Sequence, residues 1–136
     1  MEWDELFSRA DVLTIHVQLS DTSRGWIKAR EFERMKESAF LINTSRGPII
    51  EQEALLHALR TRGIAGAALD VYDIEPLPSD HPLLALDNVL LSPHSGYNAE
   101  SMLRQFYRDS VDNLQAWMAD APSNVLNEEV LDHRRQ

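Results

Sequence analysis

Ala39-Phe40-Leu41-Ile42-Asn43-Thr44-Ser45-Arg46-Gly47 is an unbroken apolar run of strand length that ends in a polar turn. Polar turns also follow predicted strands in Ala68-Leu69-Asp70-Val71-Tyr72-Asp73-Ile74-Glu75-Pro76 and in Ser92-Pro93-His94-Ser95-Gly96-Tyr97, which comes directly after the apolar run Val89-Leu90-Leu91. Continuous apolar runs are typical of strands that are buried in a parallel sheet. Because open α/β sheets build their ligand sites where such strands end, we expect the charged residues of the three turns to form a site.

Segments with helical spacing alternate with these apolar runs along the chain. The expected helices are Trp3–Arg9, about Ala29–Lys36, Glu51–Arg62 and about Ala99–Ala119, and the expected strands are Val12–Val17, Ala39–Asn43, Ile64–Leu69 and Val89–Leu91. In the last helix, the positions expected to be buried are Met102, Phe106, Val111, Leu114 and Trp117. This alternation predicts an α/β fold, a partial Rossmann-like three-layer arrangement of about four parallel strands with helices on both faces. We expect one domain over residues 1–121 and a C-terminal tail over residues 122–136.

The composition excludes several classes of protein. A length of 136 residues with 43% hydrophobic residues is ordinary for one globular domain. The 13 Lys and Arg residues against 22 Asp and Glu residues give a net charge of -9, which would repel a nucleic-acid backbone. The lack of cysteine suits a reducing compartment, so we expect a cytoplasmic protein. The apolar runs are too short to span a bilayer, the acidic start does not resemble a signal peptide, and no histidine pair has metal-ligand spacing, so we expect neither a membrane nor a metal as a partner.

The three stretches each carry a side chain with useful chemistry. Arg46 offers a planar donor fork that fits a carboxylate, and Glu75 is an acid that favours a protonated histidine beside it. His94 is a histidine, the residue type that is most used to exchange protons near neutral pH. Taken singly, these have simpler interpretations: a solvated loop arginine, a histidine that shapes a turn, and a surface charge. Asp70 also has a simpler interpretation, as an acid at the end of a strand that caps a loop. Their joint occurrence favours a site that binds a carboxylate and moves a proton beside it.

Four motifs together resemble those of the D-isomer-specific 2-hydroxyacid dehydrogenases, the phosphoglycerate-dehydrogenase-like proteins. The motifs are Asp11-Val12-Leu13-Thr14-Ile15-His16-Val17-Gln18-Leu19-Ser20 with Thr22-Ser23-Arg24-Gly25, then Leu41–Gly47, then Ala68–Tyr72 with Glu75-Pro76, and then Ser92–Tyr97. They occur in the family's order and cover nearly the whole chain. The resemblance is to the C-terminal part of the family's NAD-binding domain only.

This resemblance implies a role for particular residues. Arg46 would hold the substrate carboxylate, His94 would be the general acid and base, and Glu75 would orient His94 and favour its protonated form. On the cofactor side, Asp70 would contact the nicotinamide carboxamide, and three residues would line the site more loosely, namely His16, Thr44 and Gly96. The implied cofactor is NAD or NADP, and the implied substrate is a small 2-oxo or 2-hydroxy acid.

The chain also departs from the family's pattern. It has no G-x-G-x-x-G turn, which grips the cofactor phosphates, and we expect the family's separate substrate domain to be missing. Gln18 stands where the family usually has Pro, and Ser45 stands where Ala is common. We therefore expect a fragment or truncated member of the family that is inactive alone. The alternative is a non-catalytic, oligomeric binding or assembly module derived from such a dehydrogenase.

Truncation also predicts a partner. In the parent fold, the strand Val12–Val17 lies in the middle of the sheet beside the strand that bears the glycine-rich turn. Without that neighbour, its backbone N–H and C=O groups would be unpaired. We therefore expect a homo-oligomer, such as a dimer, formed through the exposed Val12–Val17 edge or through uncovered helix faces.

Overall fold

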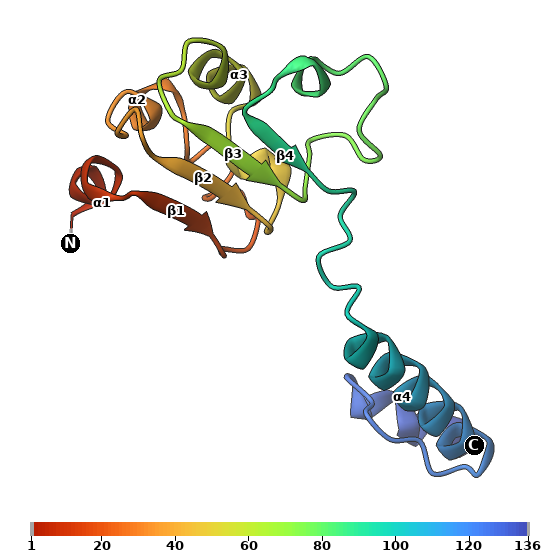
Figure 1. The fold of residues 1–136 in the computed structure, drawn as a ribbon. Helices are drawn as coiled ribbons and strands as arrows, with labels where there is room; N and C mark the ends of the chain where they lie inside the picture. Colours follow the sequence, from red (N-terminus) through yellow and green to blue (C-terminus); the bar gives the residue numbers. More distant parts are fainter. Residues whose placement is uncertain (1, 136) are drawn as a thin grey trace. The chain divides into compact units, whose positions relative to one another are not determined.

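Parallel strands organise the N-terminal part of the computed structural model, which describes residues 2–135. Four strands in these residues form one sheet in the order β1-β2-β3-β4, all parallel (Figure 1). Their bounds are Val12–Ile15 for β1, Phe40–Asn43 for β2, Gly66–Leu69 for β3 and Val89–Leu91 for β4. The expected α/β fold with about four parallel strands is confirmed. The first strand ends earlier than expected, at Ile15, because its pairing partner Asn43 is the last residue of β2.

Two helices and two short 3-10 turns connect the strands, and a further helix precedes β1. The helices are α1 (Trp3–Arg9), α2 (Ala29–Phe32) and α3 (Gln52–Arg60), and the 3-10 turns are Gly47–Ile49 and Pro82–Ala85. The helix α2 is shorter than expected because the chain tightens after it. There, Arg34 and Met35 donate to the carbonyls three residues before them, those of Glu31 and Phe32.

The hydrophobic core lies on one face of the sheet. Strand registers align Leu13 with Leu41 and Ala67 on that face, where they pack in one cluster with Phe7 of α1 and Leu55 of α3. Side chains of a strand point alternately to the two faces, so the neighbouring residues face the other way. The exposed fractions there are 56% for Val12, 50% for Phe40 and 71% for Leu90. Helices were expected on both faces, but those within residues 2–96 contribute their buried side chains to a core on one face.

The chain divides into two compact units, residues 1–96 and residues 97–136. The expected domain ran to residue 121, whereas the first compact unit ends at Gly96. The second unit holds the helix α4 (Glu100–Met118) and a 3-10 segment, Glu128–Arg135. Among residues 2–135, no helix is both long enough and apolar enough to cross a membrane.

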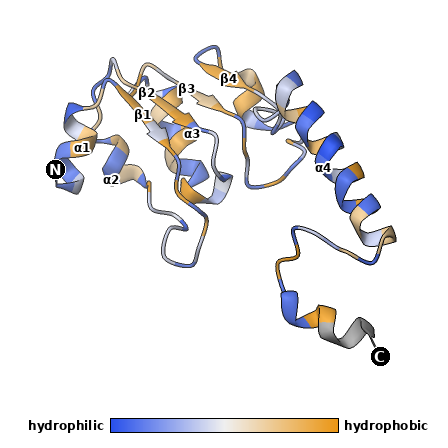
Figure 2. Cartoon of the chain, turned by 90° about the horizontal axis from the view of Figure 1, so that it is seen from below, coloured by the Kyte–Doolittle hydropathy of each residue, from blue (hydrophilic) through white to orange (hydrophobic). Residues whose placement is uncertain are grey.

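The prediction that α4 buries its apolar side was wrong. None of its residues is buried. The exposed fractions at the five expected core positions are 45% for Met102, 46% for Phe106, 52% for Val111, 57% for Leu114 and 52% for Trp117. Apolar and polar residues do alternate along the helix (Figure 2). Periodicity identifies which side of a helix is apolar, but burial needs other elements to cover that side.

Candidate active site at the carboxyl ends of the strands

The parallel sheet brings the sequence-predicted residues to one edge. His16 follows β1, Thr44 and Arg46 follow β2, Asp70 follows β3, and His94 lies just beyond β4. Since all four strands run in the same direction, their carboxyl ends lie along the same edge of the sheet (Figure 1). This is the edge where open α/β sheets carry ligands.

Glu75 and His94 form a hydrogen-bonded pair at this edge. The distance from Nδ1 of His94 to Oε2 of Glu75 is 2.6 Å, and the two side chains remain 40% and 34% exposed. The other oxygen of Glu75, Oε1, accepts from the Tyr72 amide at 2.9 Å. The hydrogen bond with His94 is the largest cause that holds the pKa of the Glu75 carboxyl below its ordinary value. An ionised Glu75 accepts the Nδ1 proton of His94, which leaves Nε2 as the ring atom that can exchange a proton with a ligand.

The turn after β2 is shaped by Asn43, which is 1% exposed. Its side-chain nitrogen donates to the Arg46 carbonyl at 2.9 Å, and its oxygen accepts from the Ser45 amide at 3.0 Å. The Ser45 hydroxyl donates to the Val17 carbonyl, which ties this turn to the segment after β1. Arg46 itself is exposed, and its positive charge also lowers the pKa of Glu75. The geometry therefore presents a guanidinium and an imidazole at the same edge.

Asp70 and Gly96 are also brought together, but by contacts within the protein. Asp70 is 8% exposed, and its two oxygens accept from the amides of Ser95 and Gly96, both at 2.9 Å. Burial alone would raise the pKa of Asp70, but hydrogen bonds from the Ser92 side chain and from these two amides lower it.

His16 and Thr44 are less closely tied to this cluster. His16 is exposed, and its Nε2 lies 2.9 Å from the hydroxyl of Thr14, a residue of β1. Thr44 is exposed on the turn after β2. Both residues lie at the expected edge, and their role toward a cofactor stays a prediction.

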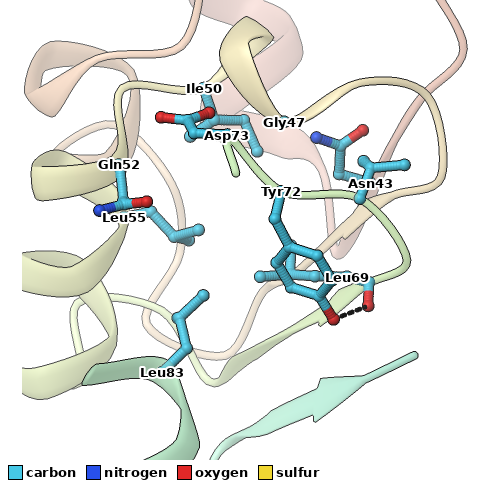
Figure 3. Close-up of a pocket in the computed structure, with 10 residues that line it drawn as sticks. Asn43, Gly47, Ile50, Gln52, Leu55, Leu69, Tyr72, Asp73 and Leu83 are labelled. Atoms are coloured by element: carbon cyan, nitrogen blue, oxygen red, sulfur yellow. Dashed lines mark hydrogen bonds between the residues drawn. The ribbon is translucent and has the colours of Figure 1, made fainter. Parts of the chain in front are cut away.

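Sequence reasoning missed Tyr72. Its amide holds Glu75, and its hydroxyl lies 3.1 Å from the Leu69 carbonyl and 2.8 Å from the Ser92 carbonyl. Burial raises the pKa of this phenol, so it stays protonated and available as a donor near neutral pH. Figure 3 shows the contact with Leu69. The only signal in the sequence was its position between Asp70 and Glu75, because the carbonyls that it bridges lie at the ends of two different strands.

The Glu75–His94 pair borders a hollow of about 530 Å³. Leucine side chains contribute an apolar wall to it, namely those of Leu77, Leu84 and Leu91. Sites for small molecules commonly combine such a wall with a few polar groups that fix orientation. The hollow places apolar surface directly beside the acid and base pair.

The residues present fit only one end of a dinucleotide. His94 and Arg46 are accessible at the strand ends, where a nicotinamide and an acid would react. By contrast, the five glycines of the chain, at positions 25, 47, 63, 66 and 96, do not have the spacing of a phosphate-binding turn. The chain therefore presents accessible basic side chains at the strand ends, and its sequence contains no glycine-rich phosphate-binding turn.

Comparisons with known proteins agree with this arrangement. Residues 1–96 match the family described as "D-isomer specific 2-hydroxyacid dehydrogenase, NAD binding domain". A glyoxylate reductase of Thermofilum pendens is 40% identical over 129 residues, which are 94% of this chain and 38% of that protein. This chain thus spans about two fifths of the length of that relative.

Two solved structures are similar as well. The D-isomer specific 2-hydroxyacid dehydrogenase from Lactobacillus delbrueckii ssp. bulgaricus, in its NAD-complexed form, is 26% identical with a TM-score of 0.78, over 91% of this chain and 42% of that one. The corresponding enzyme from Xanthobacter autotrophicus Py2, in complex with NADPH and MES, is 35% identical with a TM-score of 0.70, over 91% of this chain and 50% of that one. The match over residues 1–96, the parallel sheet and these neighbours lead to one conclusion: the chain belongs to the D-isomer-specific 2-hydroxyacid dehydrogenase family, whose NAD-binding domain it carries in part.

Proposed function

We propose that this chain supplies the acid–base and carboxylate-binding groups of an NAD(P)-dependent D-2-hydroxyacid dehydrogenase. The reaction would interconvert a 2-hydroxy acid and the corresponding 2-oxo acid. The observation that carries the proposal is the 2.6 Å contact between His94 and Glu75, with the charge of Arg46 acting on the same carboxylate. Membership of the family, whose NAD-binding domain matches residues 1–96, supports the proposal.

In the direction of reduction, Arg46 would bind the carboxylate of the 2-oxo acid with its planar fork of N–H donors. His94, protonated and held at Nδ1 by Glu75, would donate its Nε2 proton to the carbonyl oxygen. The hydride that reaches the carbonyl carbon is what a reduced nicotinamide supplies when bound. Proton and hydride together convert the ketone to the alcohol, and His94 is left neutral. The hydrogen bond from Nδ1 to Glu75 would keep the ring oriented so that Nε2 faces the carbonyl oxygen.

We further propose that the chain is inactive by itself. Hydride transfer needs the reacting atoms to be held about 3–3.5 Å apart, and that positioning depends on anchoring the whole cofactor. The glycine-rich turn that anchors its phosphates in such folds does not occur in this sequence. The nicotinamide end alone offers too few contacts to replace it.

Titrating the purified chain with NADH in a calorimeter tests this point. We expect no measurable heat at high protein concentration, because the phosphate anchor is lacking. NADPH serves as a parallel titrant, since the choice between the two cofactors is not encoded in this segment. Micromolar binding of either cofactor would contradict the proposal that the chain is inactive because it binds the cofactor too weakly. Reduction of 2-oxo acids by the chain should then be assayed.

A second candidate function is assembly, in which the chain associates with a second copy of itself. The observation in its favour is that β1 pairs on one side only, with β2, while Val12, Phe40 and Leu90 are at least half exposed on one face of the sheet. An unpaired strand edge beside apolar surface favours pairing with another chain. The proposed occupant of this edge is β1 of a second copy.

Sedimentation velocity tests the assembly proposal. We expect a dimer that weakens when Val12→Lys places a charge on the edge strand. Ser8→Lys adds the same charge on the exposed side of α1 and should leave the sedimentation coefficient unchanged. A monomer at every concentration of the unmodified chain would contradict the proposal.

A further inference from the structure

Asp70 is a buried carboxylate whose two oxygens are bound by the segment that follows His94. Oδ1 accepts from the Ser95 amide and Oδ2 accepts from the Gly96 amide, each at 2.9 Å. These residues lie more than twenty positions away in the chain, so the contact joins the end of β3 to the segment after β4. Asp70 thus holds the backbone directly after His94.

The backbone at His94 needs such support. The φ angle of His94 is +53°, in the left-handed region that residues other than glycine rarely occupy. A left-handed residue turns the next backbone N–H groups toward a common point, where they can bind one anion. Here the anion is the Asp70 carboxylate, whose lowered pKa keeps it charged.

Gly96 fits the same geometry. A Cβ built on it would lie 2.9 Å from Oδ2 of Asp70, which is closer than real Cβ contacts allow. A side chain at this position would therefore push the carboxylate and the amide apart. Asp70 can approach this segment closely because residue 96 has no side chain.

We propose that Asp70 is a positioning residue: by binding the Ser95 and Gly96 amides, it holds His94 in the left-handed backbone conformation that turns its ring toward Glu75. This is distinct from a contact of Asp70 with the nicotinamide. The use of His94 as an acid rests on the proposed function above, but its placement by Asp70 does not. The Tyr72 amide holds Glu75, so both halves of the pair are fixed by residues of the segment that follows β3, Asp70 for His94 and Tyr72 for Glu75.

A carboxyl NMR titration of the full chain tests the proposal, with the pKa of Glu75 as the readout. Three groups lower that pKa, namely His94, the Tyr72 amide and Arg46, and the hydrogen bond with His94 is the largest cause. In Asp70→Asn, only one oxygen remains, and the new NH₂ group faces an amide N–H. If the segment relaxes and the pair opens, the pKa of Glu75 rises toward its ordinary value of 4.5.

The direction of the shift separates positioning from simple electrostatics. Removing a negative charge without moving His94 would lower the pKa of Glu75 or leave it unchanged, because ionisation becomes easier. Asp73→Asn is the matched control, since it removes a carboxylate two residues from Glu75 and none of the hydrogen bonds to Ser95 or Gly96. We expect a rise in Asp70→Asn and no rise in Asp73→Asn.

Two further measurements keep the proposal testable if Asp70→Asn does not fold. Gly96→Ala should also raise the pKa of Glu75, because the added methyl group displaces Oδ2 without changing any charge. In the unmodified chain, the amide signals of Ser95 and Gly96 should titrate with the Asp70 carboxyl. The proposal is overturned if the Glu75 pKa stays low in a folded variant, or if these amides do not respond to Asp70. Neither measurement uses enzyme activity, so this proposal about Asp70 and the proposed dehydrogenase function can each be contradicted without the other.

Discussion

Replacing Gly47 with alanine should cost about 3 kcal/mol of unfolding free energy, the upper end of the roughly 1–3 kcal/mol that overpacking typically costs, because this contact cannot relax. A Cβ on Gly47 would lie 2.1 Å from the carbonyl carbon of Tyr72, 2.4 Å from its oxygen and 2.6 Å from the Asp73 nitrogen. These are backbone atoms, so no side-chain rotation relieves the clash. Figure 3 shows Gly47 opposite Tyr72 and Asp73. Thermal unfolding followed by circular dichroism should show Tm lower by about 12–24 °C for a unit of this size.

The matched control for this substitution is Gly63→Ala. A Cβ at Gly63 would meet its nearest neighbours, the Ala58 carbonyl oxygen and the Thr61 hydroxyl, at 3.6 Å, which is ordinary contact. We expect its Tm to stay within a few degrees of the unmodified chain, since surface changes usually cost less than about 0.5 kcal/mol. Equal Tm values for the two variants would show that the segments after β2 and β3 do not pack as closely as described. Gly47→Ala should also move Tyr72 and so disturb the Glu75 carboxylate that its amide holds.

His94→Gln should lower kcat by about 10²–10⁴-fold in an enzyme that depends on this chain for its acid and base. Such an enzyme can be made by exchanging the matching 129 residues of the Thermofilum pendens relative for this chain. The assay is glyoxylate reduction with NADH or NADPH, followed by absorbance. Glutamine retains hydrogen-bonding groups near Glu75 but cannot deliver a proton at neutral pH, so the loss should appear in kcat more than in KM.

The control for this substitution is His57→Gln, the same chemical change at an exposed position of α3. It should leave kcat unchanged in the same chimera. If the unmodified chimera reduces glyoxylate and His94→Gln retains kcat within about tenfold, His94 is not the proton donor, because general acid catalysis contributes more than that. The proposed function would then need another acid at the strand ends.

The local pattern of the sequence predicted the strands and their parallel arrangement. Runs such as Phe40–Ile42 are apolar throughout, and they formed parallel strands as such runs typically do. What pattern could not show is which faces are covered. Phe40 belongs to an apolar run yet is 50% exposed, and Phe106 lies on the apolar side of α4 yet is 46% exposed. Burial depends on which other elements pack against a residue, and those elements lie far away in the sequence.

The same division applies to the candidate site. The sequence by itself determined that Arg46, Glu75 and His94 follow strands, and parallel strands of one sheet must end at a common edge. The pairing of Glu75 with His94 was expected from the family resemblance, and the tertiary structure gave its distance of 2.6 Å. Only the tertiary structure decided that Asp70 binds the backbone after His94. The physical reason is that hydrogen bonds require particular directions and separations of backbone groups. Those are set by strand register and by the left-handed turn at His94, which residue identity and spacing do not specify.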